Sequence, residues 1–371
     1  MKISIDIRSL QANRKTGVWV YTQNLVEAIS RIDKNNMYYL IGSGIRVKRE
    51  DIIIDVGVNF RKIILRIPDR EFMYKDILWN KVVLPISCLK QKIDIFHQPV
   101  GHSLPMCGRF KKIITIHDLR TLHIKDFLPQ DIDAMKRACK IADAIIAISE
   151  FTKKDILQHL DAEENKVHTI YNGISTKIKK IKDEVLLEHY RKKYSLNKPF
   201  IFCLGMVPRK NIPRLLDAFA KSKYVKDVLL VLAGSSGGHL PQYKQKVKEL
   251  RIEDYVRMYE NVPEKDLSYF YSDAVGFIFP SLVEGFGLPL LEAQKCGAPV
   301  ACSHTSALPE VVGDSALLFD PYSINEISSA IDKIVSNARL RESLTKKGYE
   351  NLNRFNWDKS AKQLVKIYEG L

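Results

Sequence analysis

The residues best suited to chemistry lie in loops that follow apolar, β-rich runs. The most specific pattern is 280-PSLVEGFGLPLLEAQKCGAPV-300, where Glu284 lies in a glycine-flanked turn and Glu292 lies one turn inside a helix begun by Pro289. One carboxylate is on a loop and the other on a helix, so they can reach different parts of one ligand. Acids near a helix N-terminus are favoured by roughly 0.3–1 kcal/mol, which gives Glu292 a structural alternative. The sequence offers no comparable structural reason for Glu284.

Two adjacent cations, Arg209 and Lys210, follow another apolar run in 204-LGMVPRKNIPRLL-216. Asn211 is expected to cap the next helix and Pro213 to lie in its first turn. The cations repel each other and the positive end of the helix dipole unless an anion lies between them. A diphosphate that gains charge as it leaves would be such an anion, and charge-assisted hydrogen bonds contribute about 1.5–3 kcal/mol each. We therefore favour anion binding over a solvated surface pair.

Two loops of the first half carry weaker signals. Gly17 begins a helix after the first apolar run, where backbone N–H groups can face an anion, although Thr16 could simply cap that helix. His117 and Asp118 end the run KIITIH, and a His–Asp pair can orient an imidazole. The alternative there is a capping aspartate beside a packed histidine.

Two further positions have the same placement but less specific chemistry. His97 ends the run IDIFH without an adjacent acid, so we rank it below His117. The loop 233-AGSSGG-238 would let a ligand approach the backbone closely, although glycine and serine are equally typical of a flexible loop.

No pattern predicts a metal site. The D-x-D sequence at 131–133 lies in a helical stretch rather than at a strand end, so we interpret it as surface. The six cysteines form no C-x-x-C pair and mostly lie in apolar runs, which favours buried, reduced thiols: Cys88, Cys107, Cys139, Cys203, Cys296 and Cys302.

Short apolar runs alternate with longer helical patterns along all 371 residues, which predicts an α/β fold with parallel sheets. The length favours two domains. The predicted strands are 2–7, 38–42, 62–65, 93–97, 112–117, 142–149, 166–171, then 201–207, 228–234, 255–259, 274–280, 299–303 and 316–320. We expect a first domain at 1–178, a charged helical linker at 179–198, a second domain at 199–354, and a helix at 355–371 that returns to the first domain.

Composition and net charge limit the kinds of molecule that this protein could bind and the compartment in which it could act. No apolar run reaches the roughly 18–20 residues that span a bilayer, and the N-terminus is typical of a strand, so we expect a cytoplasmic protein. The net charge of +15 attracts anions, but no nucleic-acid-binding module is recognisable. Segment 61–92 interleaves Lys and Arg with Phe72, Met73, Trp79 and Val82, which indicates either attachment to an anionic inner-membrane surface or a core helix with a basic outer face.

Taken together, the motifs resemble the retaining glycosyltransferases of family 4, which have the GT-B fold of two Rossmann-like, doubly wound domains facing a central cleft. The glutamate-x7-glutamate motif is the most specific match. GVWVY, TIHDL, AISEFTKKDI, YNGI, LGMVPRKN and LAGSSGG follow the family's order over about 15–350. The combination of LGMVPRKN, HDL and LAGSSGG is most similar to the bacterial mannosyltransferases of O-antigen and capsule synthesis.

The resemblance implies roles for individual residues. Arg209 and Lys210 would hold the donor diphosphate, Glu292 the nucleotide ribose, and Gly17 would let its loop close over the phosphates. Glu284 would bind the sugar hydroxyls and His117 would lie near the reacting carbon. The backbone at Phe286, Gly287 and Leu288 would complete the donor site. Two positions depart from the family pattern: Met206 stands where many members have Arg, and Trp19 where a second glycine is common.

The resemblance also implies a reaction. A hexose would move from a nucleoside-diphosphate donor to a lipid-linked saccharide, by front-face attack with retained configuration and without metal or cofactor. GDP-mannose is the expected donor, with UDP-hexose or UDP-N-acetylhexosamine as the alternative. The enzyme would act at the cytoplasmic face of the membrane as a peripheral protein. Two other functions remain open: a nucleotide-sugar epimerase on the same fold, and a non-catalytic lipid-binding assembly protein.

Overall fold

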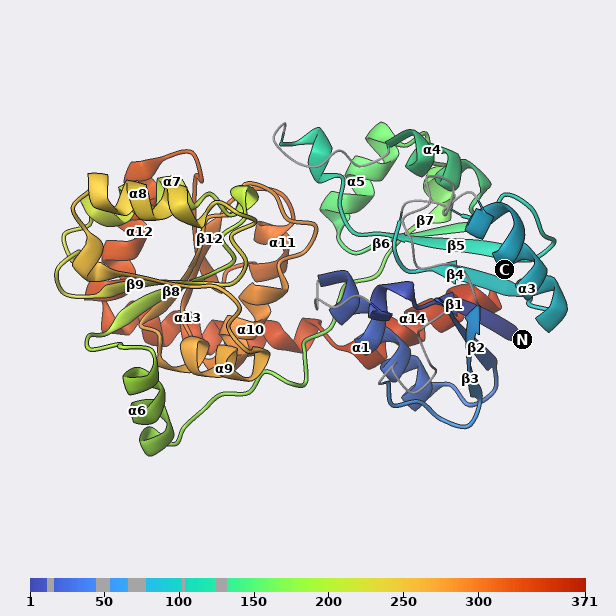
Figure 1. Cartoon of the computed structure of the whole chain (residues 1–371), viewed down its shortest axis with the longest axis horizontal. Coiled ribbons are helices and arrows are strands. Elements are labelled where there is room, and N and C mark those ends of the chain that lie inside the picture. The colour runs from blue at the N-terminus through green and yellow to red at the C-terminus, as the bar shows by residue number, and fades with distance from the viewer. Residues whose placement is uncertain (12–16, 45–53, 66–77, 102–103, 125–131) are drawn as a thin grey trace. The chain divides into compact units, whose positions relative to one another are not determined.

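The computed structural model describes residues 1–11, 17–44, 54–65, 78–101, 104–124 and 132–371 (Figure 1). The chain divides into two compact units. The first contains the residues up to Gly173, except a short segment that starts at Arg120, together with Phe355–Leu371. The second contains that short segment and Ile174–Arg354.

The first unit is built on a seven-stranded sheet in the order β3-β2-β1-β4-β5-β6-β7, and its strand pairs are parallel. Its central strands are buried on both faces, as expected when helices cover a parallel sheet. The strands are β1 (Lys2–Asp6), β2 (Met37–Ser43), β3 (Phe60–Leu65), β4 (Ile95–Gln98), β5 (Lys111–Ile116), β6 (Ala144–Ala147) and β7 (Val167–Thr169). The helices are α1 (Gly17–Ile32), α3 (Leu84–Gln91), preceded by a π-helical turn at Trp79–Val83, α4 (Ile132–Ile141), α5 (Glu150–His159) and α14 (Trp357–Glu369).

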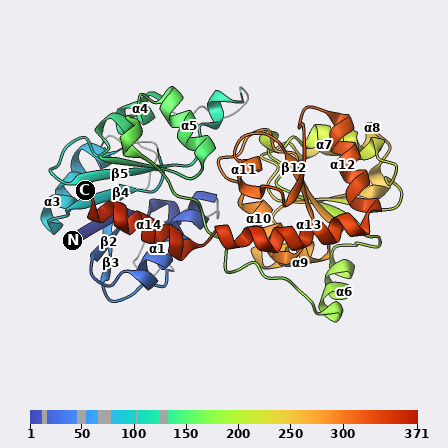
Figure 2. The same cartoon turned by 180° about the vertical axis from the view of Figure 1, so that it is seen from behind.

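The C-terminal helix α14 belongs to the first unit, where it lies beside α1 (Figure 2). Asn356 caps it by accepting from the backbone N–H groups of two residues in its first turn. Gly173 packs directly against the start of the helix, since a Cβ at this position would lie 2.3 Å from the backbone nitrogen of Trp357. Only glycine therefore allows this approach.

A buried hydrogen-bonded chain connects α14 to the sheet. The Tyr368 hydroxyl lies 2.7 Å from His97 Nδ1, and His97 Nε2 lies 2.9 Å from Thr115 Oγ1. Thr115 Oγ1 also lies 3.2 Å from the Tyr21 hydroxyl on α1. Burial lowers the pKa of His97 to about 3, so its ring is neutral. His97 therefore has a structural role in joining α14, β4 and β5.

The second unit has a six-stranded parallel sheet in the order β10-β9-β8-β11-β12-β13. The strands are β8 (Phe200–Leu204), β9 (Leu229–Ala233), β10 (Val256–Tyr259), β11 (Gly276–Phe279), β12 (Val300–Ser303) and β13 (Ala316–Phe319). The helices are α6 (Glu184–Lys193), α7 (Ile212–Lys221), α8 (Leu240–Glu249), α9 (Glu264–Asp273), α10 (Leu288–Cys296), α11 (Leu308–Val312), α12 (Ile324–Ser336) and α13 (Ala338–Asn351).

The strand order of the second unit reverses between β8 and β11. These strands are neighbours, with Ile201 opposite Gly276 and Phe202 opposite Phe277, although more than 70 residues separate them in the chain. Their connecting loops therefore leave the same edge of the sheet side by side. In open α/β sheets this reversal opens a crevice beyond the carboxyl ends of the strands, where ligands bind.

All thirteen predicted strands are present, but the segment predicted as a linker, 179–198, lies within the second unit. Arg191 on α6 forms an ion pair with Asp273 at 2.5 Å, and Lys193 forms one with the buried Asp266 at 2.5 Å. The charges that indicate a solvated linker from the sequence instead attach α6 to α9.

Five of the six cysteines are buried free thiols, but Cys107 is exposed, contrary to the expectation of burial. Of the D-x-D acids, Asp133 is exposed on α4 and Asp131 lies outside the described residues. Within the described ranges, no cluster of three His, Cys, Asp or Glu could hold a metal ion. No helix in the same ranges is long and apolar enough to cross a membrane.

The His97–Tyr368 contact gives a stability prediction. Tyr368→Phe leaves Nδ1 of the buried His97 ring without its hydroxyl partner, which costs about 1–3 kcal/mol. The midpoint of thermal unfolding should fall by roughly 2–4 °C for each kcal/mol in a domain of this size. Tyr322→Phe, at an exposed tyrosine, is the matched control. Equal midpoints for the two variants would contradict a structural role for this contact.

Candidate active site

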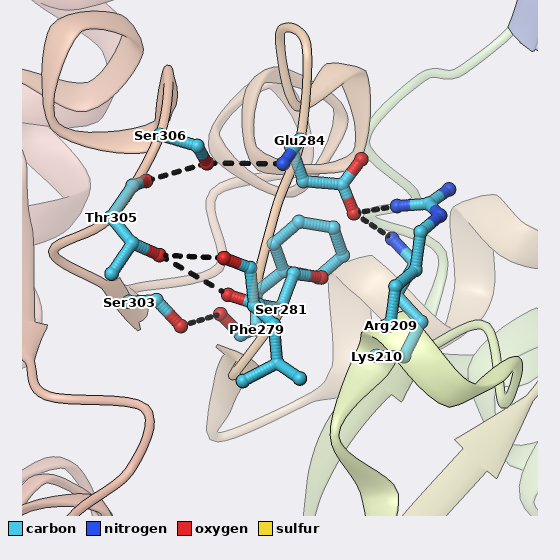
Figure 3. Close-up of polar contacts among 9 residues, drawn as sticks. Arg209, Lys210, Phe279, Ser281, Glu284, Ser303, Thr305 and Ser306 are labelled. Carbon is cyan, nitrogen blue, oxygen red and sulfur yellow. Dashed lines mark hydrogen bonds and ion pairs between the residues drawn. The ribbon is translucent and has the colours of Figure 1, made fainter. Parts of the chain in front are cut away.

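The loops after β8 and β11 meet at the reversal of strand order in the second unit (Figure 3). The first carries Arg209 and Lys210 in a 3₁₀ turn, Pro208–Lys210. The second carries Glu284. A backbone hydrogen bond joins the two loops directly, because the N–H of Leu282 donates to the carbonyl of Arg209 at 2.8 Å. Residues that lie 74 and 75 positions apart in the sequence thus come into contact.

Glu284 forms ion pairs with both cations through one oxygen. Its Oε1 accepts from Nη1 of Arg209 and, at 2.7 Å, from Nζ of Lys210. The exposed fraction of the side chain is 6% for Lys210, 11% for Glu284 and 24% for Arg209. The cluster of two cations and one anion is therefore largely buried.

The electrostatics keep Glu284 and Lys210 charged at neutral pH. Burial acts to raise the pKa of Glu284, but the nearby charges of Arg209 and Lys210 outweigh it and lower that pKa to about 2. Burial lowers the pKa of Lys210 to about 8, with Arg209 acting in the same direction and Glu284 opposing both. The cluster therefore carries one net positive charge.

The cluster is held by its surroundings. The backbone N–H of Glu284 donates to Ser306 Oγ at 3.0 Å, and Thr305 Oγ1 donates to the carbonyl of Leu282 at 3.2 Å. The ammonium group of Lys210 lies 3.8 Å from the centre of the Phe279 ring, in cation–π geometry. Ser306 and Thr305 were not predicted from the sequence. Their only signal is their position after β12, the strand that neighbours β11.

Two inferences from the sequence need correction here. The cations do not lack a partner, because Glu284 supplies the anion, and Glu284 in turn has a structural reason for its identity. Asn211 does not cap α7 with its side chain. It lies in the left-handed region at φ 58° and donates its amide to the carbonyl of Pro321 at 2.7 Å. The hydrogen bond to Pro321, far away in the sequence, has replaced the predicted hydrogen bond to the first turn of α7.

The second carboxylate of the motif lies in a different environment. Glu292 is on α10, and its Oε2 accepts a hydrogen bond from the Tyr271 hydroxyl at 3.0 Å. Burial raises the pKa of Glu292 to about 7, and the hydrogen bond from Tyr271 opposes this only in part. Neutral pH therefore lies within the titration range of this carboxyl group. Tyr271 was not predicted as part of the site.

The chain turns into α10 at Gly287, whose φ of 104° strongly favours glycine. Phe286 is buried before it, and Leu288 begins the helix. Because the first backbone N–H groups of a helix have no partner within it, this end of α10 is suited to polar ligand atoms. In the sequence, the N-terminus of α10 thus falls between the two carboxylates of the motif, Glu284 and Glu292.

The loop 233–238 lies against the loop that carries the cations. The N–H of Gly205 donates to the carbonyl of Ala233 at 2.6 Å, and the N–H of Met206 donates to that of Ser235 at 3.0 Å. Ser236 donates to the carboxylate of Glu260. The glycine-rich loop is therefore fixed by backbone contacts beside the cluster rather than being an open flexible segment.

The candidates of the first unit form a separate group. His117 Nε2 donates to the carbonyl of Pro99 at 2.8 Å. The Tyr21 ring packs against the imidazole edge to face at 4.7 Å. Tyr21 is one turn after Gly17, where α1 begins. A Cβ at Gly17 would have no atom within 4 Å, so packing in the described chain does not require glycine there.

Two glycosyltransferase family profiles match this chain, one in each half. The profile described as "Glycosyltransferase Family 4" matches residues 16–178, and that described as "Glycosyl transferases group 1" matches residues 188–351. The chain is 29% identical over 271 residues to the O-antigen chain mannosyltransferase B of Escherichia coli, covering 70% of each protein.

Two further similarities differ in coverage. The serotype-specific mannosyltransferase WbdA of Escherichia coli is 29% identical over 237 residues, which span 59% of this chain and 28% of WbdA. The Anabaena protein HepE, solved in complex with UDP-glucose, superposes with a TM-score of 0.78 over the full length of both chains at 16% identity. The last similarity shows a shared fold.

The environment of Glu292 predicts a pH-dependent stability. Its pKa is higher in the folded protein, about 7, than its ordinary value of 4.5, so the folded state binds more protons between these values. Stability associated with this group is present below pH 4.5 and lost as the pH rises through 7. Glu292→Gln should therefore raise the unfolding temperature more at pH 8 than at pH 5.5.

Thermal unfolding at the two pH values measures this effect. Glu342→Gln, at an exposed glutamate on α13, controls for the loss of a carboxylate. If the unfolding temperatures of Glu292→Gln and wild type differ by the same amount at pH 5.5 and pH 8, the pKa of Glu292 is not raised in the folded protein.

Proposed function

Because this chain belongs to the family 4 glycosyltransferases, we propose that it transfers mannose from GDP-mannose to a lipid-linked saccharide during synthesis of a cell-surface polysaccharide. The observation that carries this proposal is the cluster of Arg209, Lys210 and Glu284 at the crevice of the second unit. Similarity to O-antigen mannosyltransferases favours mannose as the sugar. UDP-hexose and UDP-N-acetylhexosamine are the alternative donors.

The donor would bind along the carboxyl edge of the second sheet. Arg209 and Lys210 would hold the diphosphate, and the carboxylate of Glu292 would accept hydrogen bonds from the ribose hydroxyls. Glu284 and the backbone at Phe286, Gly287 and Leu288 would hold the sugar. For His117 and Gly17 of the first unit, the roles implied by the family resemblance stay predictions, near the sugar and near the phosphates respectively.

The proposed reaction breaks the bond between the anomeric carbon and the diphosphate oxygen. The acceptor hydroxyl attacks from the same face, forms the new glycosidic bond, and gives its proton to the departing phosphate oxygen. Configuration is thereby retained. Charge develops on the diphosphate, and the fixed charges of Arg209 and Lys210 would stabilise it in a site with little water. These two cations supply the role that a metal ion has in other transferases.

The two glutamates are better suited to binding than to covalent catalysis. Oε1 of Glu284 accepts from two cations, which is typical of a group that binds and orients charge. Glu292 is hydrogen-bonded to Tyr271 on the helix side of the motif. Both observations favour front-face attack over a glycosyl-enzyme intermediate.

The donor assignment is tested by binding and turnover together. GDP-mannose should protect the protein against thermal unfolding more than UDP-sugars do, since a ligand at 100 times its Kd stabilises by about 2.7 kcal/mol. Lys210→Ala should lower kcat/KM for transfer about 10²–10³-fold, because one of two charges on the leaving group is lost. Lys347→Ala, at a partly exposed lysine on α13, is the matched control.

Two outcomes would overturn the transferase proposal. Rapid isomerisation of the donor without an acceptor would identify an epimerase, whereas slow hydrolysis would not. If cells that carry Lys210→Ala or Glu284→Ala still make the cell-surface polysaccharide normally, the protein is a non-catalytic assembly protein.

Attachment to an anionic membrane is the second part of the proposal. Four apolar side chains are exposed along the continuous helical segment 78–91, at a spacing that aligns them on one side: Leu78, Val82, Ile86 and Leu89. Lys81, Lys90 and Lys92 are exposed in the same region. Exposed apolar residues flanked by lysines are typical of helices that lie in a membrane surface.

The structure changes which residues of segment 61–92 could take part. Trp79 is 1% exposed, with the guanidinium of Arg8 4.4 Å from its ring centre, so it packs in the core rather than facing outward. Val82 is 43% exposed. Phe72 and Met73 lie outside the described residues.

Liposome flotation tests this attachment. The protein should float with vesicles that contain anionic lipid, and added salt should weaken binding because it screens the lysines. The double variant Ile86→Glu, Leu89→Glu should float several-fold less. Val185→Glu, at an exposed apolar residue on α6 of the second unit, is the control. Absent or salt-independent flotation of the wild type would contradict the proposal.

A further inference from the structure

We infer that the carboxylate of Glu284 and the donor diphosphate compete for Arg209 and Lys210, and that the carboxylate must leave both cations before the donor can bind. This inference rests on the proposed donor site in the second unit. It gives Glu284 two successive partners. These are Arg209 and Lys210 before the donor binds, and the sugar hydroxyls afterwards.

The geometry of the cluster carries the first half of the inference. Both cations converge on the same carboxylate oxygen, as Figure 3 shows. In the part of the chain that the structure describes, no other carboxylate lies within ion-pair distance of either cation. The groups proposed to hold the diphosphate are therefore already bound to an anion that the protein itself provides.

Burial explains why the protein provides it. Lys210 is almost completely buried beside a second cation, and an unpaired buried charge is strongly destabilising. A carboxylate at this position stabilises the two cations. The same carboxylate would repel a bound diphosphate if it stayed in place, since like charges at contact distance disfavour each other. Donor binding and the Glu284 ion pairs therefore exclude each other.

The exchange needs only a side-chain movement. The backbone of Glu284 is held by the hydrogen bond from its N–H to Ser306, and the N–H of Ala307 donates to the carbonyl of Glu284 at 3.4 Å. The hydrogen bonds drawn to the carboxylate in Figure 3 come from Arg209 and Lys210. Rotation about its own side-chain bonds would release the cations while the loop stays fixed.

The exchange has a consequence for specificity. A nucleoside diphosphate without sugar displaces Glu284 and leaves it without a hydrogen-bond partner. A complete nucleotide sugar offers its hydroxyl groups to the released carboxylate. Glu284 should therefore weaken binding of the product diphosphate relative to the donor, which favours product release after transfer.

Isothermal titration of GDP and GDP-mannose, and of UDP and UDP-glucose, into wild type and Glu284→Gln tests the exchange. The variant removes the competing charge at nearly constant shape, so it should bind the nucleoside diphosphate roughly tenfold more tightly. The ratio of affinities for nucleotide sugar over nucleoside diphosphate should fall by a similar factor. Asp314→Asn, at an exposed acid of the same unit, matches the change in net charge.

The outcomes separate the inference from the proposed function. Wild type that binds none of these nucleotides would overturn the donor site itself and the inference with it. Wild type that binds, with Glu284→Gln unchanged or weaker for the nucleoside diphosphate, would overturn the exchange alone. If the variant fails to fold, a crystal structure of wild type with a nucleoside diphosphate decides the question. Phosphate oxygens bound to Lys210, with Glu284 displaced, support the exchange. An intact contact between Glu284 and Lys210 overturns it.

Discussion

The need of a buried lysine for a counter-charge governs the site of this protein. Lys210 is enclosed beside Arg209, and water cannot stabilise its charge there. Glu284 meets this need through a single oxygen. The ion pairs thus stabilise the buried charge of Lys210. A transferase has the same requirement in each cycle, because its leaving group arrives bound to a sugar and departs with more negative charge.

The topology of the second unit makes this pairing possible. The cations and the carboxylate follow strands β8 and β11, which are adjacent only because the strand order reverses between them. The backbone hydrogen bond from Leu282 to Arg209 then fixes the two loops to each other. The next strand, β12, leads to Ser306, which holds the backbone of Glu284. Three neighbouring strand ends therefore build one charged cluster.

The first unit shows how two similar histidines acquire different roles. His97 and His117 both end apolar runs, but His97 lies inside a chain of buried hydroxyl groups that includes Tyr368 of the returning helix α14. His117 is only partly buried, and its ring is oriented by the carbonyl of Pro99 and the edge of Tyr21. The hydroxyl of Tyr21 belongs to the same chain as His97, through Thr115. The structural histidine thus helps to hold the environment of the candidate functional one.

The sequence alone determined the features that depend on local pattern. The alternation of apolar runs with helical stretches predicted thirteen strands and two doubly wound sheets, and the spacing around Glu284 and Glu292 identified the motif. Tertiary structure decided the partners: that Glu284 neutralises Arg209 and Lys210, that Asn211 binds Pro321 instead of capping a helix, and that Trp79 is buried. The physical reason is that a charge or hydrogen-bonding group is stabilised by whatever lies within a few ångströms, and in this fold that neighbour is commonly 70 or more residues away in the chain.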